Sequence, residues 1–260
     1  MSFFEHSDGT RAAFDITGNG PPLLLIHGAE GSRRSFDRLV PMLSDQFTVI
    51  VYDQRDCGET VNAAESSDLR LLAADVAELL QGTGYSPAHV FGTSFGGRVA
   101  QAVALLHAQA VKSLVLASTW PLPLSLRDLN GEVAVEMVRL RDRLPESAER
   151  LAEYFFPPAF LSEYPQFRHH FARAPVRSAR SDRRAQTVND QTSLAAGDIA
   201  ARTLLLAGAC DRLVPSALTV GMKNAIRDSE SVVLAGVGHI TCVQAPAEVA
   251  DHLQRFLGST

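Results

Sequence analysis

The residue best suited to nucleophilic chemistry is Ser94, at the centre of Gly92-Thr93-Ser94-Phe95-Gly96. The apolar run 88–91 predicts a short buried strand before it, and the run 97–106 predicts a helix after it. A serine between strand and helix lies on a sharp turn with its hydroxyl exposed, and small residues two positions away let the backbone fold back closely. The pentapeptide alone also arises by chance, so its partners decide the interpretation.

A serine hydroxyl needs a base to take its proton, and the base needs a third group to orient it. His239 follows the last apolar strand, and Asp211 lies just past the preceding one. No acid follows the strand at 111–117, where Ser118-Thr119-Trp120 stands, so Asp211 is the candidate orienting acid. The alternatives are a structural loop histidine and a turn-forming aspartate. We expect Ser94, Asp211 and His239 to form a catalytic triad.

An acyl-transfer enzyme also needs donors for an oxyanion. The stretch 27–32 follows a strand and is rich in small residues. We expect the backbone N–H groups of Ala29 and Phe95 to form the oxyanion hole, with His27 holding the loop by hydrogen bonds. The alternative for His27-Gly28 is a plain strand-ending turn.

Short apolar runs alternate with longer helical ones, a pattern typical of a parallel sheet covered by helices on both faces. The first residues predict an antiparallel hairpin that turns at Asp8-Gly9 and ends by Asp15. The alternation breaks between about 121 and 200, which we interpret as a helical cap inserted in the sheet domain. The predicted strands are 22–26, 47–52, 88–91, 111–117, 202–207 and 231–234, and the predicted helices are 36–43 (capped by Ser35), 69–80, 97–106 and 247–256.

Composition narrows the class of protein. The 260 residues are 46% hydrophobic and 20% charged with a net charge of -5, which argues against nucleic acid as a partner. No apolar run is long enough to cross a bilayer, and residues 1–9 lack the regions of a signal peptide. Three cysteines without metal spacing indicate free thiols, so we expect a cytoplasmic protein. Metal and nucleotide motifs are absent, so we expect neither cofactor nor metal.

These motifs together resemble the α/β-hydrolase superfamily, in particular its serine esterase and lactonase members. The resemblance implies an eight-stranded, mostly parallel sheet with helices on both faces and a helical cap. We expect a core domain of 1–120 and 201–260, with the cap at 121–200. The matching motifs are strand–His27-Gly28, Tyr52 to Gly58, Gly92 to Gly97, Gly208 to Asp211 and Gly238-His239.

One position departs from the family pattern: many members have glycine where this chain has Asp56. We expect Arg55 to form a structural ion pair with Asp53 or Asp56.

The nucleophile narrows the reactions that the resemblance allows. Members that open epoxides or displace halide use aspartate where this chain has Ser94. We therefore expect a serine hydrolase that cleaves a small carboxylic ester or lactone through an acyl-enzyme. A C–C bond hydrolase for a dienoate and a cofactor-free perhydrolase are alternatives within the family. A receptor-like protein that binds a ligand with little turnover is the alternative of another class.

The substrate pocket is predicted from position alone. We expect Gly28, Trp120, Phe155 and Phe156 to line it, although most aromatics of the cap should form its own core. Cys242 follows His239 closely and is expected to border the site without acting as a nucleophile. The cap also carries a run of arginines, which either binds a substrate carboxylate or forms a solvated face: Arg168, Arg173, Arg177, Arg180, Arg183 and Arg184.

Overall fold

The computed structural model describes residues 1–172, 178–190 and 192–258. Eight strands form one sheet in the order β1-β2-β4-β3-β5-β6-β7-β8, and only the β1–β2 and β2–β4 pairs are antiparallel. The fold class predicted from the sequence is confirmed. The strands are β1 (Ser2–Glu5), β2 (Arg11–Thr17), β3 (Pro22–Ile26), β4 (Thr48–Tyr52), β5 (Ala88–Thr93), β6 (Val111–Ala117), β7 (Thr203–Gly208) and β8 (Ser229–Leu234).

The sheet separates two apolar layers because successive side chains of a strand point to opposite faces. In β3, Leu24 and Ile26 pack in the layer with α2 (Leu69–Gly82) and α3 (Phe95–Leu106). Their neighbours Leu23 and Leu25 pack in the opposite layer with α1 (Val40–Leu43) and α11 (Pro246–Leu257). Burial on both faces explains why the strands read as continuous apolar runs. Two short helices, α9 (Ser216–Gly221) and α10 (Thr241–Gln244), complete the sheet domain.

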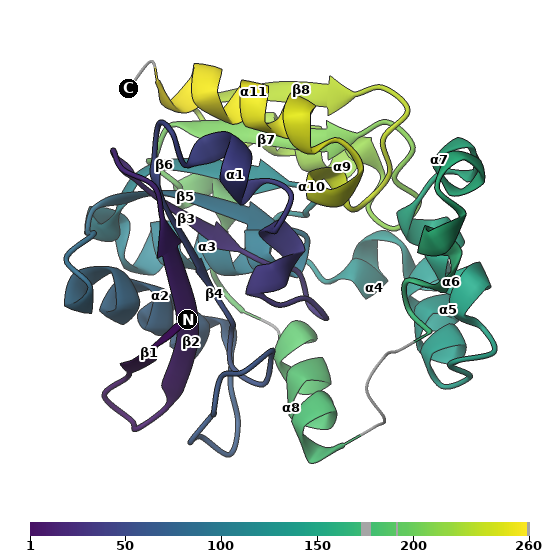
Figure 1. Cartoon of the computed structure of the whole chain (residues 1–260), viewed down its shortest axis with the longest axis horizontal. Coiled ribbons are helices and arrows are strands. Elements are labelled where there is room, and N and C mark those ends of the chain that lie inside the picture. Colours follow the sequence, from purple (N-terminus) through teal and green to yellow (C-terminus); the bar gives the residue numbers. More distant parts are fainter. Residues whose placement is uncertain (173–177, 191, 259–260) are drawn as a thin grey trace.

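The insertion between β6 and β7, which we call the cap, carries five helices in its described part. In Figure 1, α5, α6 and α7 gather at one side of the molecule, and α8 lies apart from them below the sheet. A separate apolar cluster fills the cap, as expected, with Leu151, Phe156 and Phe160 among its buried members. The exact domain boundaries stay a prediction. The helices are α4 (Leu126–Leu129), α5 (Gly131–Arg141), α6 (Ala148–Phe155), α7 (Pro158–Glu163) and α8 (Ala179–Val188).

The helix predicted at 36–43 was wrong in its extent. The structure has a 3₁₀ turn at Arg33–Phe36, capped by Ser32, followed by the short helix α1. Pro41 has no N–H to donate and fits only the first turn of a helix, so no continuous helix runs through it. Ser35 consequently lies inside the 3₁₀ turn and does not cap a helix.

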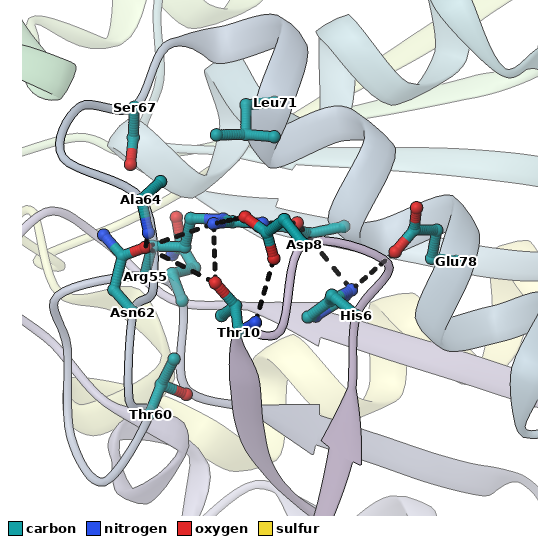
Figure 2. A network of polar contacts seen from close by, with 12 residues as sticks. His6, Asp8, Thr10, Arg55, Thr60, Asn62, Ala64, Ser67, Leu71 and Glu78 are labelled. Carbon is teal, nitrogen blue, oxygen red and sulfur yellow. Dashed lines mark hydrogen bonds and ion pairs between the residues drawn. The ribbon is translucent and has the colours of Figure 1, made fainter.

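The predicted ion pair of Arg55 was also wrong in its partners. The Arg55 guanidinium binds both carboxylate oxygens of Asp75, at 2.6 and 2.7 Å, and one oxygen of Asp8 at 2.6 Å. Figure 2 shows that Arg55 joins the turn between β1 and β2, represented by Asp8 and Thr10, to the loop that contains Asn62. Asp75 belongs to α2, so this network ties three parts of the fold together.

Two further carboxylates of the same loop have other partners. Asp53 accepts hydrogen bonds from Arg33, including one of 2.6 Å from its backbone N–H. Asp56 has a φ of 60°, a left-handed conformation that favours glycine, and its carboxylate pairs with Arg183 at 2.6 Å. The positive φ accounts for the glycine that many family members have at this position.

In the described ranges, none of the helices has the length and hydropathy to cross a bilayer.

Candidate active site

Ser94 lies at the turn between β5 and α3, with a φ of 54° and a ψ of -124°. Such a conformation is strained for a side-chain residue and persists only where its surroundings enforce it. A Cβ on Gly92 would lie 2.3 Å from the Gly96 carbonyl oxygen, and a Cβ on Gly96 would lie 2.3 Å from that of Ile26. The two glycines of the motif are therefore needed for close packing of the turn. The Thr119 hydroxyl donates to the Ser94 carbonyl at 2.6 Å, a support that the sequence did not reveal.

The structure brings Ser94, His239 and Asp211 into one hydrogen-bonded row. His239 Nε2 lies 2.9 Å from Ser94 Oγ, and His239 Nδ1 lies 2.8 Å from Asp211 Oδ2. The other carboxylate oxygen of Asp211 accepts the N–H groups of Leu213 and Val214 at 2.9 and 2.8 Å. Because an ionised carboxylate only accepts, Nδ1 carries the ring proton and Nε2 is left to accept the serine proton. This is the arrangement that nucleophilic catalysis by serine requires.

The loop after β8 holds His239 against the cap. The His239 backbone N–H donates to the Phe155 carbonyl at 2.9 Å, and the two rings meet edge to face with centroids 5.5 Å apart. A Cβ on Gly238 would lie 2.5 Å from the same carbonyl, so only glycine permits this approach. His239 is 3% exposed and Asp211 is 7% exposed, whereas Ser94 is half-buried. Of these three residues, Ser94 is therefore the one most accessible to solvent.

His27 organises the loop after β3. Its Nε2 accepts the Gln54 backbone N–H at 3.2 Å, so the proton lies on Nδ1, which donates to the Gly28 carbonyl at 2.8 Å. Burial and the charge of Arg184 lower the pKa of His27 to about 4, which keeps the ring neutral. The C=O and N–H of one trans peptide point in opposite directions. Holding the Gly28 carbonyl therefore directs the Ala29 N–H the other way, as the predicted role of His27 requires.

The two expected oxyanion donors are both available. Within the described part of the chain, neither the Ala29 N–H nor the Phe95 N–H donates to another group. Phe95 begins α3, so its N–H lies at the positive end of the helix dipole. Gly28 lies against the nucleophile, since a Cβ built on it would be 3.4 Å from Ser94 Cβ.

The predicted pocket residues fall into two groups. Gly28 and Phe155 contact the triad as described above. Phe156 is 1% exposed and its ring packs on Phe160 and Phe167, with centroids 5.3 and 5.2 Å apart, so these contacts place it in the core of the cap. Trp120 is also buried, and its indole N–H donates to the Leu124 carbonyl at 3.0 Å. A lining role for Phe156 has no support from these contacts.

The arginines of α8 do not form a solvated face. Arg183 pairs with Asp56, and Arg180 donates to the Gly58 carbonyl at 2.8 Å. Arg184 is 6% exposed and donates to the Ala29 carbonyl at 2.9 Å. The expectation of a solvated face was wrong for Arg184, whose partners belong to loops far away in the sequence. Two other arginines of the predicted run lie outside the described residues: Arg173 and Arg177.

Cys242 packs in the apolar layer between the sheet and α11, and its burial raises the pKa of the thiol to about 12. Over the described ranges, no cluster of three or more His, Cys, Asp or Glu side chains could hold a metal ion.

Known proteins resemble this chain over most or part of its length. A model of the family described as the alpha/beta hydrolase fold matches residues 21–246. The pyrrolizixenacetamide deacetylase of Xenorhabdus hominickii is 27% identical over 258 residues, which cover 95% of this chain and 94% of that protein. The soluble epoxide hydrolase of Corynebacterium sp. (strain C12) is 38% identical over 93 residues, 36% of this chain and 32% of that protein.

A solved structure agrees with the family match. A thermophilic esterase from Thermogutta terrifontis superposes with a TM-score of 0.82 at 25% identity, over 98% of this chain and 96% of that one. Together with the family match over most of the sequence, the fold and the Ser94 turn lead to one conclusion: this chain belongs to the α/β-hydrolase fold family.

Proposed function

We propose that the protein is a serine hydrolase that cleaves a small carboxylic ester or lactone through an acyl-enzyme. The observation that carries this proposal is the unbroken row of hydrogen bonds from Ser94 Oγ through the His239 ring to Asp211. Two backbone N–H groups, those of Ala29 and Phe95, have no hydrogen-bond acceptor among the described residues and lie on the two segments next to the nucleophile. A nucleophile, a base, an orienting acid and oxyanion donors are the complete set for acyl transfer.

The first half of the reaction forms the acyl-enzyme. Ser94 Oγ attacks the carbonyl carbon while His239 Nε2 takes the serine proton, and the Ala29 and Phe95 N–H groups bind the resulting oxyanion. Asp211 keeps the ring oriented and stabilises its positive charge. When the tetrahedral intermediate collapses, the C–O bond to the leaving alcohol breaks and His239 returns the proton to that alcohol.

The second half of the reaction releases the acid. Water attacks the acyl carbonyl while His239 accepts its proton, and the second tetrahedral intermediate forms in the same oxyanion hole. Its collapse breaks the bond to Ser94 Oγ, to which the proton returns. With a lactone as substrate, the alcohol stays attached to the acyl chain, and the product is a hydroxy acid.

The relatives support hydrolysis of acyl compounds. The Xenorhabdus protein is named a deacetylase and the Thermogutta protein an esterase. We expect the acyl group to be small because the cap closes over the base: His239 is 3% exposed and its ring touches Phe155.

A substrate screen tests the proposal. Wild type and Ser94→Ala are assayed with short-chain p-nitrophenyl esters, small lactones and a dienoate, and both are treated with a fluorophosphonate probe. We expect the wild type to turn over an ester or lactone and to take up the probe, and Ser94→Ala to do neither. Binding without turnover in the wild type would instead favour a receptor-like protein. Cleavage of the dienoate alone would favour a C–C hydrolase.

A further inference from the structure

Arg184 of the cap reaches both segments that carry the proposed oxyanion donors. Its Nε donates to the Ala29 carbonyl at 2.9 Å, and its Nη2 donates to Gln54 Oε1 at 3.1 Å. Its guanidinium lies over the ring of Phe95, 4.7 Å from the ring centroid. One side chain of α8 thus contacts the two residues whose N–H groups face the developing oxyanion in the proposed reaction.

Gln54 carries the influence of Arg184 to His27. Because Arg184 holds the amide oxygen of Gln54, the amide nitrogen faces the His27 carbonyl, to which it donates at 2.6 Å. The carbonyls of residues 27, 28 and 29 are therefore bound in turn by Gln54, by the His27 ring and by Arg184. The Gly28 carbonyl shares its peptide with the Ala29 N–H, and the other two carbonyls belong to the peptides on either side. With all three held, the Gly28–Ala29 peptide has little freedom to turn its N–H away.

Arg184 has no carboxylate among its direct partners in the described part of the chain. None of the ion pairs between described residues includes Arg184, and its Nη1 is buried with no hydrogen-bond partner there. Its neighbour Arg183, in contrast, pairs with Asp56. A buried cation without a carboxylate partner weakens a fold. Ion pairing therefore does not explain an arginine at this position, whereas its place behind the oxyanion loop does.

We infer that Arg184 is a positioning residue of the active site: it holds the Ala29 carbonyl directly and the His27 carbonyl through Gln54. These two carbonyls belong to the peptides on either side of the Gly28–Ala29 peptide, so the Ala29 N–H between them keeps facing the oxyanion. The inference rests on the proposed function. It makes the geometry of the oxyanion hole depend on a helix of the cap. Arg184 does not touch the substrate in this arrangement, because its unpartnered nitrogen is sealed from solvent.

The test compares Arg184→Met with Arg183→Met, a substitution of the adjacent arginine on the same helix. The substrate is the ester on which the wild type is most active. Loss of a direct oxyanion donor costs about 10²–10³ in kcat. Since Arg184 acts through such a donor, we expect Arg184→Met to lower kcat by roughly 10- to 100-fold with KM within about threefold. Arg183→Met should keep kcat within about threefold of the wild type.

Two further measurements separate positioning from folding. Arg184→Lys keeps the charge but cannot donate to both acceptors from a rigid fork, so its kcat should lie between those of wild type and Arg184→Met. A trifluoromethyl ketone that matches the ester forms a tetrahedral adduct with an oxyanion. Its inhibition constant should rise in Arg184→Met in parallel with the loss of kcat/KM, while the Tm stays at or above that of Arg183→Met.

The inference is wrong if Arg184→Met and Arg184→Lys keep the kcat of Arg183→Met, or if only KM changes. It is also wrong if the loss of activity follows a loss of folded protein. These outcomes are distinct from failure of the proposed function, in which the wild type itself would show no turnover that depends on Ser94.

Discussion

Two buried arginines meet at the start of the loop after β4, and they have opposite kinds of partners: Arg55 belongs to this loop, and Arg184 binds it through Gln54. Arg55 is 3% exposed, and each nitrogen of its guanidinium donates a hydrogen bond to a carboxylate, that of Asp75 or that of Asp8. Arg184 is 6% exposed, yet its acceptors are one carbonyl and one amide, and one of its nitrogens has no partner within the described ranges. The two networks meet in the sequence, since Gln54, which binds Arg184, directly precedes Arg55.

The difference separates a network that holds the fold from one that shapes the site. The carboxylates of the Arg55 network come from the β1–β2 turn and from α2, so it joins distant elements (Figure 2). The Arg184 network ends on the Ala29 and His27 carbonyls beside the nucleophile. Removing one partner of the buried Arg55 pair should weaken the fold. For Arg184, which lies next to the proposed reaction centre, our inference is that geometry matters instead.

The largest effect should come from the triad, which sets the scale for the Arg184 network. Asp211→Asn leaves the turn at Leu213 in place but no longer fixes the proton on Nδ1 of His239. We expect kcat to fall by about 10⁴, as in the serine-protease template, with an unchanged Tm. Steady-state kinetics measures kcat, and thermal unfolding followed by circular dichroism measures the Tm. A near-normal kcat would mean that another carboxylate orients the histidine. The loss of kcat in Arg184→Met could then not be compared with that of a triad variant.

The next largest effect should be a loss of stability on breaking the Arg55 network, with kcat unchanged. Arg55→Met strands the Asp75 carboxylate, which is 5% exposed, and breaking a buried pair costs about 3–5 kcal/mol. We expect urea unfolding to show a loss of that order, while kcat per active site, titrated with the fluorophosphonate, stays near wild type. The double variant Arg55→Met/Asp75→Asn should recover part of the stability. A fall in kcat with unchanged stability would reverse the contrast between the two networks.

A change of pH should affect the Arg184 network in the weakly acidic range. Burial and the Arg184 charge lower the pKa of His27 to about 4, so the unfolded chain binds more protons than the folded one below the ordinary value of 6.5. His27 thus contributes stability above about pH 6.5, roughly 3 kcal/mol, which declines toward pH 4. Urea unfolding of wild type and His27→Asn at several pH values should show their difference shrink over that range. A difference in unfolding free energy that stays constant with pH would contradict the lowered pKa of His27.

The smallest effect should appear in the Arg55 network at lower pH. A hydrogen bond to Arg55 holds the pKa of Asp8 well below its usual range. Because the folded state keeps Asp8 ionised to lower pH than the unfolded chain does, this pairing stabilises the fold fully above the ordinary aspartate pKa of about 3.9. The stabilisation is lost as the pH falls below that value. The Tm difference between wild type and Asp8→Asn should therefore hold from pH 7 to pH 5 and narrow by pH 3. Narrowing already at pH 6 would contradict this.

The sequence predicted those features that local pattern decides. Ser94, Asp211 and His239 each follow an apolar strand, and the carboxyl ends of parallel strands meet at one edge of a sheet, so their meeting followed from chain order. The glycines around Ser94 also carried their own signal, because only a residue without a Cβ fits there.

Partner choice among charged residues was not predictable in the same way. Arg55 lies beside Asp53 and Asp56 in the chain, yet it pairs with Asp75 on α2, because packing brings that helix to it. Arg184 looked like one surface cation in a run of arginines, and nothing in the run marked it as buried. Gln54 carried no signal beyond its place at the end of a strand. Such contacts depend on how elements dock, which no local pattern contains.

The acyl-enzyme itself offers the most direct test of the central claim. Wild type is mixed with p-nitrophenyl acetate, quenched in acid within the first turnovers, digested and analysed by mass spectrometry. We expect a burst of nitrophenol and one acetyl group on the peptide that contains Ser94, with more acetyl trapped when deacylation is slow. Acetylation at another residue, or turnover with no covalent intermediate under conditions that give a burst, would contradict the proposed role of Ser94.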